Sequence, residues 1–243
     1  MLSCIRAENC KLRHSPIWLV FLILPLLSAI YGTFNFVQNL GILKLQWHYL
    51  WTQHTLFYAT FFFAPLAAVY ASYLWRLEHL GRNWNLITTA PVPLFQLYFA
   101  KFMVVAKMVL LTQGWVFVLF LVFGKLWARI PGWPPLEILL WMLRGLVGGL
   151  VIIALQHLLS MMIRSFAVPV LISLGGGIGG MLFVSKGMGL YWPYALMILG
   201  MNSNKTEDMV AGGLIPFFVS CCIDCVIIFF IANLILTKRD IKT

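Results

Sequence analysis

Six long apolar runs dominate this chain of 243 residues. The hydrocarbon core of a bilayer is about 30 Å thick, so a helix needs about 20 mostly apolar residues to cross it. The runs lie at about residues 17–37, 56–75, 102–123, 138–163, 167–184 and 214–236. They predict an all-α membrane protein with six transmembrane helices. The connections are short, so we expect one transmembrane domain over residues 1–243.

The composition agrees with this class and excludes others. Only 10% of the residues are charged, whereas soluble domains carry about 25%. Lipid must therefore cover most of the surface. The net charge is +10, but the basic residues are scattered between apolar runs and form no basic stretch with interleaved aromatics. We therefore expect no nucleic-acid partner.

The basic residues instead predict the orientation in the cell membrane. With the N-terminus inside, the inner connections hold ten of them: Arg6, Lys11, Arg13, Arg76, Arg82, Lys101, Arg164, Lys238, Arg239 and Lys242. The outer connections hold five: Lys44, Lys125, Arg129, Lys186 and Lys205. Positive charge favours the cytoplasmic side, so both termini are predicted to be cytoplasmic. The aromatic cluster 47–51, Trp127 and Trp133 would then form belts at the outer interface.

Two further segments are apolar without being spans. Residues 188–201 are too short to cross the hydrocarbon and are expected to form a re-entrant or interfacial outer segment. Residues 1–15 place Leu2, Ile5, Asn9 and Leu12 on one helical face. This spacing predicts an interfacial helix on the inner membrane surface.

The sequence contains no motif typical of a catalytic centre. It has no G-x-x-x-x-G-K-[ST] phosphate loop, no H-E-x-x-H and no G-x-S-x-G. Its five histidines are dispersed, and Cys222-x-x-Cys225 has no second pair or histidine nearby. We therefore expect no catalytic, cofactor-binding or metal site on this chain. An intramembrane enzyme stays as a minor alternative.

Three polar residues inside the predicted spans are candidates for a special role. They are Arg144, His157 and Asp224. Charged groups at membrane depth usually face the bundle interior or a watery cavity. Arg144 and Asp224 lie at comparable depth in the predicted topology and can pair. Two interpretations stay open, a buried ion pair that orients two helices and a part of a substrate path.

The inner connection between the second and third spans is the most informative segment. Leu77, Leu80, Trp84 and Ile87 fall at helical spacing and predict a short amphipathic helix. Pro91 then ends this helix. A surface helix of this kind is a lever on which a soluble partner can push. The alternative is a plain surface helix with no such role.

These residues resemble a known family. Glu78, Gly81, the triplet Pro91-Val92-Pro93 and then Lys101 resemble the coupling-helix region of type-2 ABC export permeases. A narrower resemblance is to the lantibiotic-immunity permeases of Gram-positive bacteria. It rests on Glu8, Lys11, Pro25, the Trp47-rich outer loop, Glu78-His79 and Asn83-Trp84.

The resemblance implies a fold and a mechanism. The fold would have six helices, an interfacial N-terminal helix and an outer re-entrant segment. Two identical or related permeases would pair and bind a dimer of a separate ATPase subunit, which carries ATP and magnesium. The ATPase would push on Glu78, Gly81, Trp84, Ile87, Pro91 and Pro93, the residues that the resemblance assigns to coupling.

The narrower resemblance also implies a cargo. That cargo would be a lantibiotic-type antimicrobial peptide, expelled from the membrane for self-protection or resistance. Two alternatives stay open. The first is an ABC permease for another amphipathic or drug-like cargo, and the second is an ion-coupled secondary transporter that works alone. The second is the weaker one, because such carriers usually show internal repeats and coupling acids.

Overall fold

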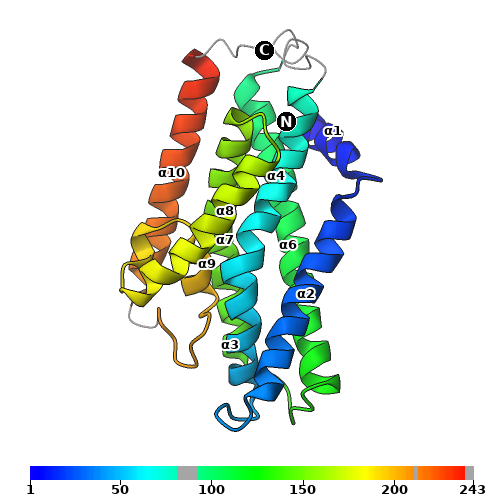
Figure 1. The fold of residues 1–243 in the computed structure, drawn as a ribbon. Coiled ribbons are helices and arrows are strands. Elements are labelled where there is room, and N and C mark those ends of the chain that lie inside the picture. The colour runs from blue at the N-terminus through cyan, green and yellow to red at the C-terminus, as the bar shows by residue number, and fades with distance from the viewer. Residues whose placement is uncertain (81–91, 211–212, 239–243) are drawn as a thin grey trace.

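A computed structural model describes residues 1–80, 92–210 and 213–238, and these residues form helices joined by short connections (Figure 1). The elements, in chain order, are α1 (Leu2–Leu12), α2 (Ile17–Gln38), α3 (Trp47–Phe57), the π-helix η1 (Tyr58–Phe62), α4 (Phe63–His79), α6 (Leu94–Leu126), α7 (Leu136–Met162), α8 (Ala167–Ser185), the 3-10 helix η2 (Gly189–Tyr191), α9 (Ala195–Gly200) and α10 (Leu214–Lys238). The described residues contain no strand. The predicted all-α class is confirmed.

Six helical segments are long and apolar enough to cross a membrane, as the sequence predicts. Two of them are longer than expected. The second, Trp47–His79, joins α3, η1 and α4 into one helical rod, and the third spans Leu94–Leu126; each has 33 residues. The hydropathy of the sequence does not mark the ends of these two segments. The ends carry polar side chains, such as His54 and Lys101, that neighbouring helices bury.

The predicted outer belt is wrong for Trp47 and Trp51. Both lie in α3 and are buried inside the bundle. The Trp51 indole donates a hydrogen bond to the carbonyl of Met201 over 2.8 Å, and its ring packs edge-on against Phe120. An indole is buried readily when its N–H has a partner, and this long-range partner is invisible in the local sequence.

The two ends of the bundle differ. Helix α1 and the C-terminal end of α10 lie at one end, which we call the α1 end (Figure 1). The connections 39–46 and 127–135 lie at the opposite end, which we call the loop end. That the α1 end faces the cytoplasm stays a prediction from the basic residues.

The N-terminal helix forms, but its predicted apolar face is only partly right. Leu12 is buried against the bundle, whereas Leu2 is 74% exposed. Glu8, which is not part of that face, is only 2% exposed. The reason is a set of ion pairs that draws Glu8 toward the bundle, described in the next subsection.

The short apolar segment after α8 folds back into the protein. Helix α9 packs against α7 and α8, with Leu196 and Met197 fully buried. The contact needs glycine in α7, because a Cβ at Gly148 would lie 2.4 Å from the carbonyl oxygen of Leu196. Protein covers this backbone, as a segment that does not cross the membrane requires.

Candidate coupling site

Four ionisable side chains from three helices meet at the α1 end. We call them the charge cluster: Glu8 and Lys11 from α1, Glu78 from α4 and Lys101 from α6. Lys11 Nζ lies 2.7 Å from Glu8 Oε1 and 2.5 Å from Glu78 Oε1. Lys101 Nζ lies 2.7 Å from Glu8 Oε2 and 2.6 Å from Glu78 Oε1. Each ammonium thus bridges both carboxylates.

Local sequence places these groups. Glu8 and Lys11 are three residues apart, so they share one face of α1. Glu78 lies in the last turn of α4, and Lys101 lies about two turns into α6, which begins right after Pro93. The cluster therefore ties α1 to both helices that flank residues 80–93.

Burial makes the cluster depend on its complete set of partners. The side chain of Lys101 is fully buried and that of Glu78 is 5% exposed. Ionised, the two carboxylates and two ammonium groups sum to zero charge. Removing one partner of a buried pair leaves an uncompensated charge, which costs about 3–5 kcal/mol.

Lys11 is the most accessible member, with 31% of its side chain exposed. Partial burial alone would lower the pKa of its ammonium, but the hydrogen bonds that it donates to Glu78 and Glu8 outweigh this effect and raise the pKa above its ordinary value. Lys11 therefore keeps its charge at neutral pH and holds the two carboxylates together from the solvent side.

An aromatic layer lies below the cluster. Lys101 Nζ lies 5.4 Å from the centre of the Trp75 ring, a cation–π contact. The Trp75 indole donates to His157 Nδ1 over 3.1 Å. His157 Nε2 must then carry the proton, and it donates to the carbonyl of Tyr98 over 3.0 Å. His157, a predicted intramembrane polar residue, is thus a neutral link between α4, α6 and α7.

The predicted coupling residues fall into two groups. Glu78 lies in the charge cluster, and Pro93 directly precedes α6. Gly81, Trp84, Ile87 and Pro91 lie outside the described residues. The sequence does not predict Glu8, Lys11 and Lys101 as site residues, although the resemblance rests partly on them. The available signal was their opposite charges near the inner ends of three predicted helices.

Arg144 has a partner that the sequence did not indicate. Its guanidinium makes two hydrogen bonds to Asp208, each of 2.8 Å, in the connection before α10. The Trp141 indole also donates to Asp208, over 3.2 Å. Within the described residues, Asp224 forms no ion pair with Arg144, and its Oδ2 has no hydrogen-bond partner. The pairing that depth suggested for Arg144 and Asp224 is therefore not the one that forms.

The Arg144–Asp208 pair lies outside the charge cluster and fixes a different region. Partial burial alone would raise the pKa of Asp208, but the hydrogen bonds from Arg144 outweigh this effect and lower it. Asp208 is therefore ionised at neutral pH. The pair anchors the connection 201–210 to α7 at the loop end.

Comparison with known families decides what this bundle belongs to. Residues 4–180 match the family described as ABC-2 family transporter protein. The match covers more than half of the chain and includes most of α1, the charge cluster and α7. The chain belongs to the ABC-2 transporter family. Neither the curated proteins nor the solved structures contain a match.

Family membership gives the charge cluster a context. As an ABC-2 transporter protein, the chain is a multi-pass membrane permease of an ABC exporter, and its partner is an ABC ATPase subunit. The permease places its most buried charges beside the connection 80–93, where the resemblance puts the coupling helix. The charge cluster is therefore our candidate coupling site.

Proposed function

We propose that this permease expels lantibiotic-type antimicrobial peptides from the membrane, driven by ATP hydrolysis on a partner ATPase dimer that holds ATP and magnesium. A second permease, identical or related, would complete the transporter. The coupling set would include Glu78, Gly81, Trp84, Ile87, Pro91 and Pro93.

One observation carries the coupling part of this proposal. The charge cluster joins α1, α4 and α6, and the last two flank the predicted coupling segment. A push on that segment would reach Glu78 at one end and α6 at the other. Because Lys101 and Lys11 bridge to Glu8, the same push would also reach α1. The cluster would thus make three helices move as one unit.

The cargo is supported by the resemblance and by the small share of charged residues in the chain. Glu8, Lys11 and Glu78 are residues on which the resemblance to the lantibiotic-immunity permeases rests, and Lys11 contacts both carboxylates directly. An amphipathic peptide needs a partly apolar route, which a bundle with so few charged residues would provide.

Expression with the cognate ATPase in a peptide-sensitive Gram-positive host tests the cargo. We expect growth at lantibiotic concentrations that kill the host, and faster release of labelled lantibiotic from its cells. A linear cationic peptide and an unrelated amphipathic drug serve as comparison cargoes. Protection against the drug alone would contradict the proposed cargo. A permease that purifies without any ATPase would contradict the proposed energy source.

A matched pair of lysines on α6 tests the coupling role. Lys101→Gln removes a bridge of the charge cluster. Lys107→Gln changes an exposed lysine on a different face of α6, which contacts Asn9 of α1. We expect resistance to fall with Lys101→Gln and to persist with Lys107→Gln at equal amounts of protein in the membrane. Equal resistance in both variants would remove the cluster from the mechanism.

A further inference from the structure

Among the buried hydroxyl groups that have no hydrogen-bond partner in the described residues, two line one cavity. They belong to Thr60, in η1, and Ser203, after α9, and both side chains are at least nine-tenths buried. Neither oxygen has a partner among the described residues. Leaving a buried polar group unsatisfied is costly, so such a group needs an explanation. A bound ligand would supply one here.

Both hydroxyls line the same cavity, which we call the polar cavity. It has a volume of about 280 Å³ and lies between η1, the end of α8 and the connection 201–210. Asn204 and Lys205 line it as well, and Met181 and Ile198 supply apolar wall. Lys205 forms no ion pair within the described part of the chain. The cavity thus combines hydroxyl donors with a free positive charge.

The connection that carries three of these groups is held in a fixed shape. The Asn202 amide donates to the carbonyls of Lys205 and Glu207 over 3.1 and 3.0 Å. Its Oδ1 accepts from the backbone N–H of Met209 over 2.9 Å. Asn202 and Asn204 both adopt positive φ, 51° and 60°, on either side of Ser203. Left-handed backbone is uncommon outside glycine and clusters at functional sites.

The π-helix positions the other hydroxyl. Thr60 lies at the centre of η1, where the helix widens for one turn. Single π-turns inside α-helices are frequent at functional sites. Helix α8 approaches this turn closely, because a Cβ at Gly177 would lie 2.3 Å from the Thr60 carbonyl oxygen. The turn is therefore clamped, and Thr60 is held at the cavity wall.

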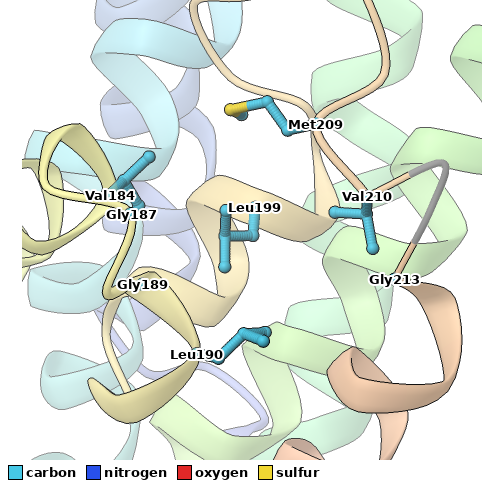
Figure 2. Close-up of a pocket in the computed structure, with 8 residues that line it drawn as sticks. All are labelled: Val184, Gly187, Gly189, Leu190, Leu199, Met209, Val210 and Gly213. Atoms are coloured by element: carbon cyan, nitrogen blue, oxygen red, sulfur yellow. The ribbon is translucent and has the colours of Figure 1, made fainter.

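An apolar cavity adjoins the polar one. It has a volume of about 320 Å³, and Val184 and Met209 line both cavities. Figure 2 shows Leu190 and Leu199 in the apolar cavity, with Met209 on the connection above them. Together the two cavities reach the range of about 300–1,000 Å³ that is typical of ligand pockets. The pair has one polar and one apolar compartment, as an amphipathic ligand requires.

We propose that these two cavities form a binding site for an anionic phospholipid. Its phosphate accepts hydrogen bonds from Thr60 and Ser203 and pairs with Lys205, while part of an acyl chain occupies the apolar cavity. Lipid reaches the site from the side of the bundle, since Met181 of the cavity wall is 41% exposed and its neighbour Leu182 is 61% exposed. This site does not depend on the identity of the exported cargo.

Native mass spectrometry of the full-length permease tests the proposal. The protein in detergent is titrated with phosphatidylglycerol and with phosphatidylcholine of the same acyl chains. We expect tighter binding of phosphatidylglycerol, because it keeps the phosphate charge and lacks the choline cation. Equal affinity for the two lipids would overturn the proposal. Displacement of bound phosphatidylglycerol by millimolar inorganic phosphate would identify a soluble anion as the ligand and overturn it too.

Three variants locate the binding. Lys205→Gln and Thr60→Val should each weaken phosphatidylglycerol binding about ten-fold, the scale of a hydrogen bond to a charged group. Lys44→Gln changes an exposed lysine at the same end of the bundle, away from the cavity, and should leave binding unchanged. Thr60→Val removes an unpartnered hydroxyl, so the thermal midpoint of the lipid-free protein should not fall. Unchanged binding in both cavity variants would overturn the site.

Discussion

The charge cluster and the polar cavity differ in whether their buried polar groups have hydrogen-bond partners. In the cluster, two ammonium groups satisfy two carboxylates and the charges cancel, so the group is complete without any ligand. In the polar cavity, the Thr60 and Ser203 hydroxyls are buried and have no partner within the described residues. The difference teaches that the charge cluster holds its helices together by itself, whereas the polar cavity keeps hydrogen-bonding capacity for the proposed ligand. The predictions below challenge this contrast, in order of decreasing effect.

Breaking the charge cluster should cost the most stability. Lys101→Met leaves two buried carboxylates short of a partner and should lower the free energy of unfolding by about 3–5 kcal/mol. Adding Glu78→Gln returns the cluster to zero net charge and should recover a share of the loss. Unfolding of the wild type, the two single variants and the double variant in mixed micelles measures the coupling energy of this double-mutant cycle. If the two effects simply add, Lys101 and Glu78 are not coupled.

Losing the Arg144–Asp208 pair should cost less, because its side chains are 11% and 27% exposed. We expect Arg144→Met to destabilise by about 1–3 kcal/mol, since it leaves a partly buried carboxylate without its hydrogen bonds. Asp208→Asn should add little on top of it, whereas Asp224→Asn should add its full effect. Additive behaviour for Asp208 and coupling for Asp224 would reverse our assignment of the partner.

The same pair predicts a pH dependence. The folded-state pKa of Asp208 is lowered below its unfolded value, so the ion pair stabilises the fold at pH values above the unfolded pKa, about 3.9. This stabilisation is lost as the pH falls through the folded pKa. The difference in thermal midpoint between the wild type and Asp208→Asn should therefore be constant near pH 7 and shrink below about pH 4. A difference that grows in acid would contradict the lowered pKa.

Two threonines give the smallest and most specific contrast. Thr112 is buried and hydrogen-bonded to Tyr70 and to the Met108 carbonyl. Thr112→Val should destabilise by about 1–2 kcal/mol, because it leaves the Tyr70 hydroxyl with fewer partners. Thr60→Val removes an unpartnered hydroxyl and should be neutral or slightly stabilising in lipid-free protein. Similar losses in both variants would mean that Thr60 has a partner in the protein.

The sequence predicts the number and class of the helices because hydrophobic length is a local property. It does not predict where α3 begins, because Trp51 is buried by a hydrogen bond to Met201, a residue 150 positions away. The rule that places tryptophan at the membrane interface gives the wrong environment when protein, rather than lipid, surrounds the indole. The fold of 188–201 against α7 follows the same logic, since its burial depends on Gly148 in another helix.

The site could be predicted in part. The sequence indicates Glu78 by its position before the predicted coupling segment. Its lysine partners lie in α1 and α6, far from it in the sequence, and contact it only in the folded structure. The sequence does not predict the position of Asp208, because the connection that contains it has no hydrophobic periodicity. The sequence does not indicate that the hydroxyls of Thr60 and Ser203 lack partners, because a threonine in an apolar helix or a serine in a loop is common.

The central claim is that the charge cluster transmits the work of the ATPase to the helices. Lys11 is its best probe, because it is the most exposed member and Lys101 still bridges both carboxylates after its loss. The decisive measurement is labelled lantibiotic released per ATP hydrolysed, in proteoliposomes that contain the permease and its ATPase. For Lys11→Gln the account predicts continued ATP hydrolysis with about ten-fold less peptide released per ATP, if the bridge is worth about 1.4 kcal/mol to the coupled state. An unchanged ratio of peptide to ATP would contradict it.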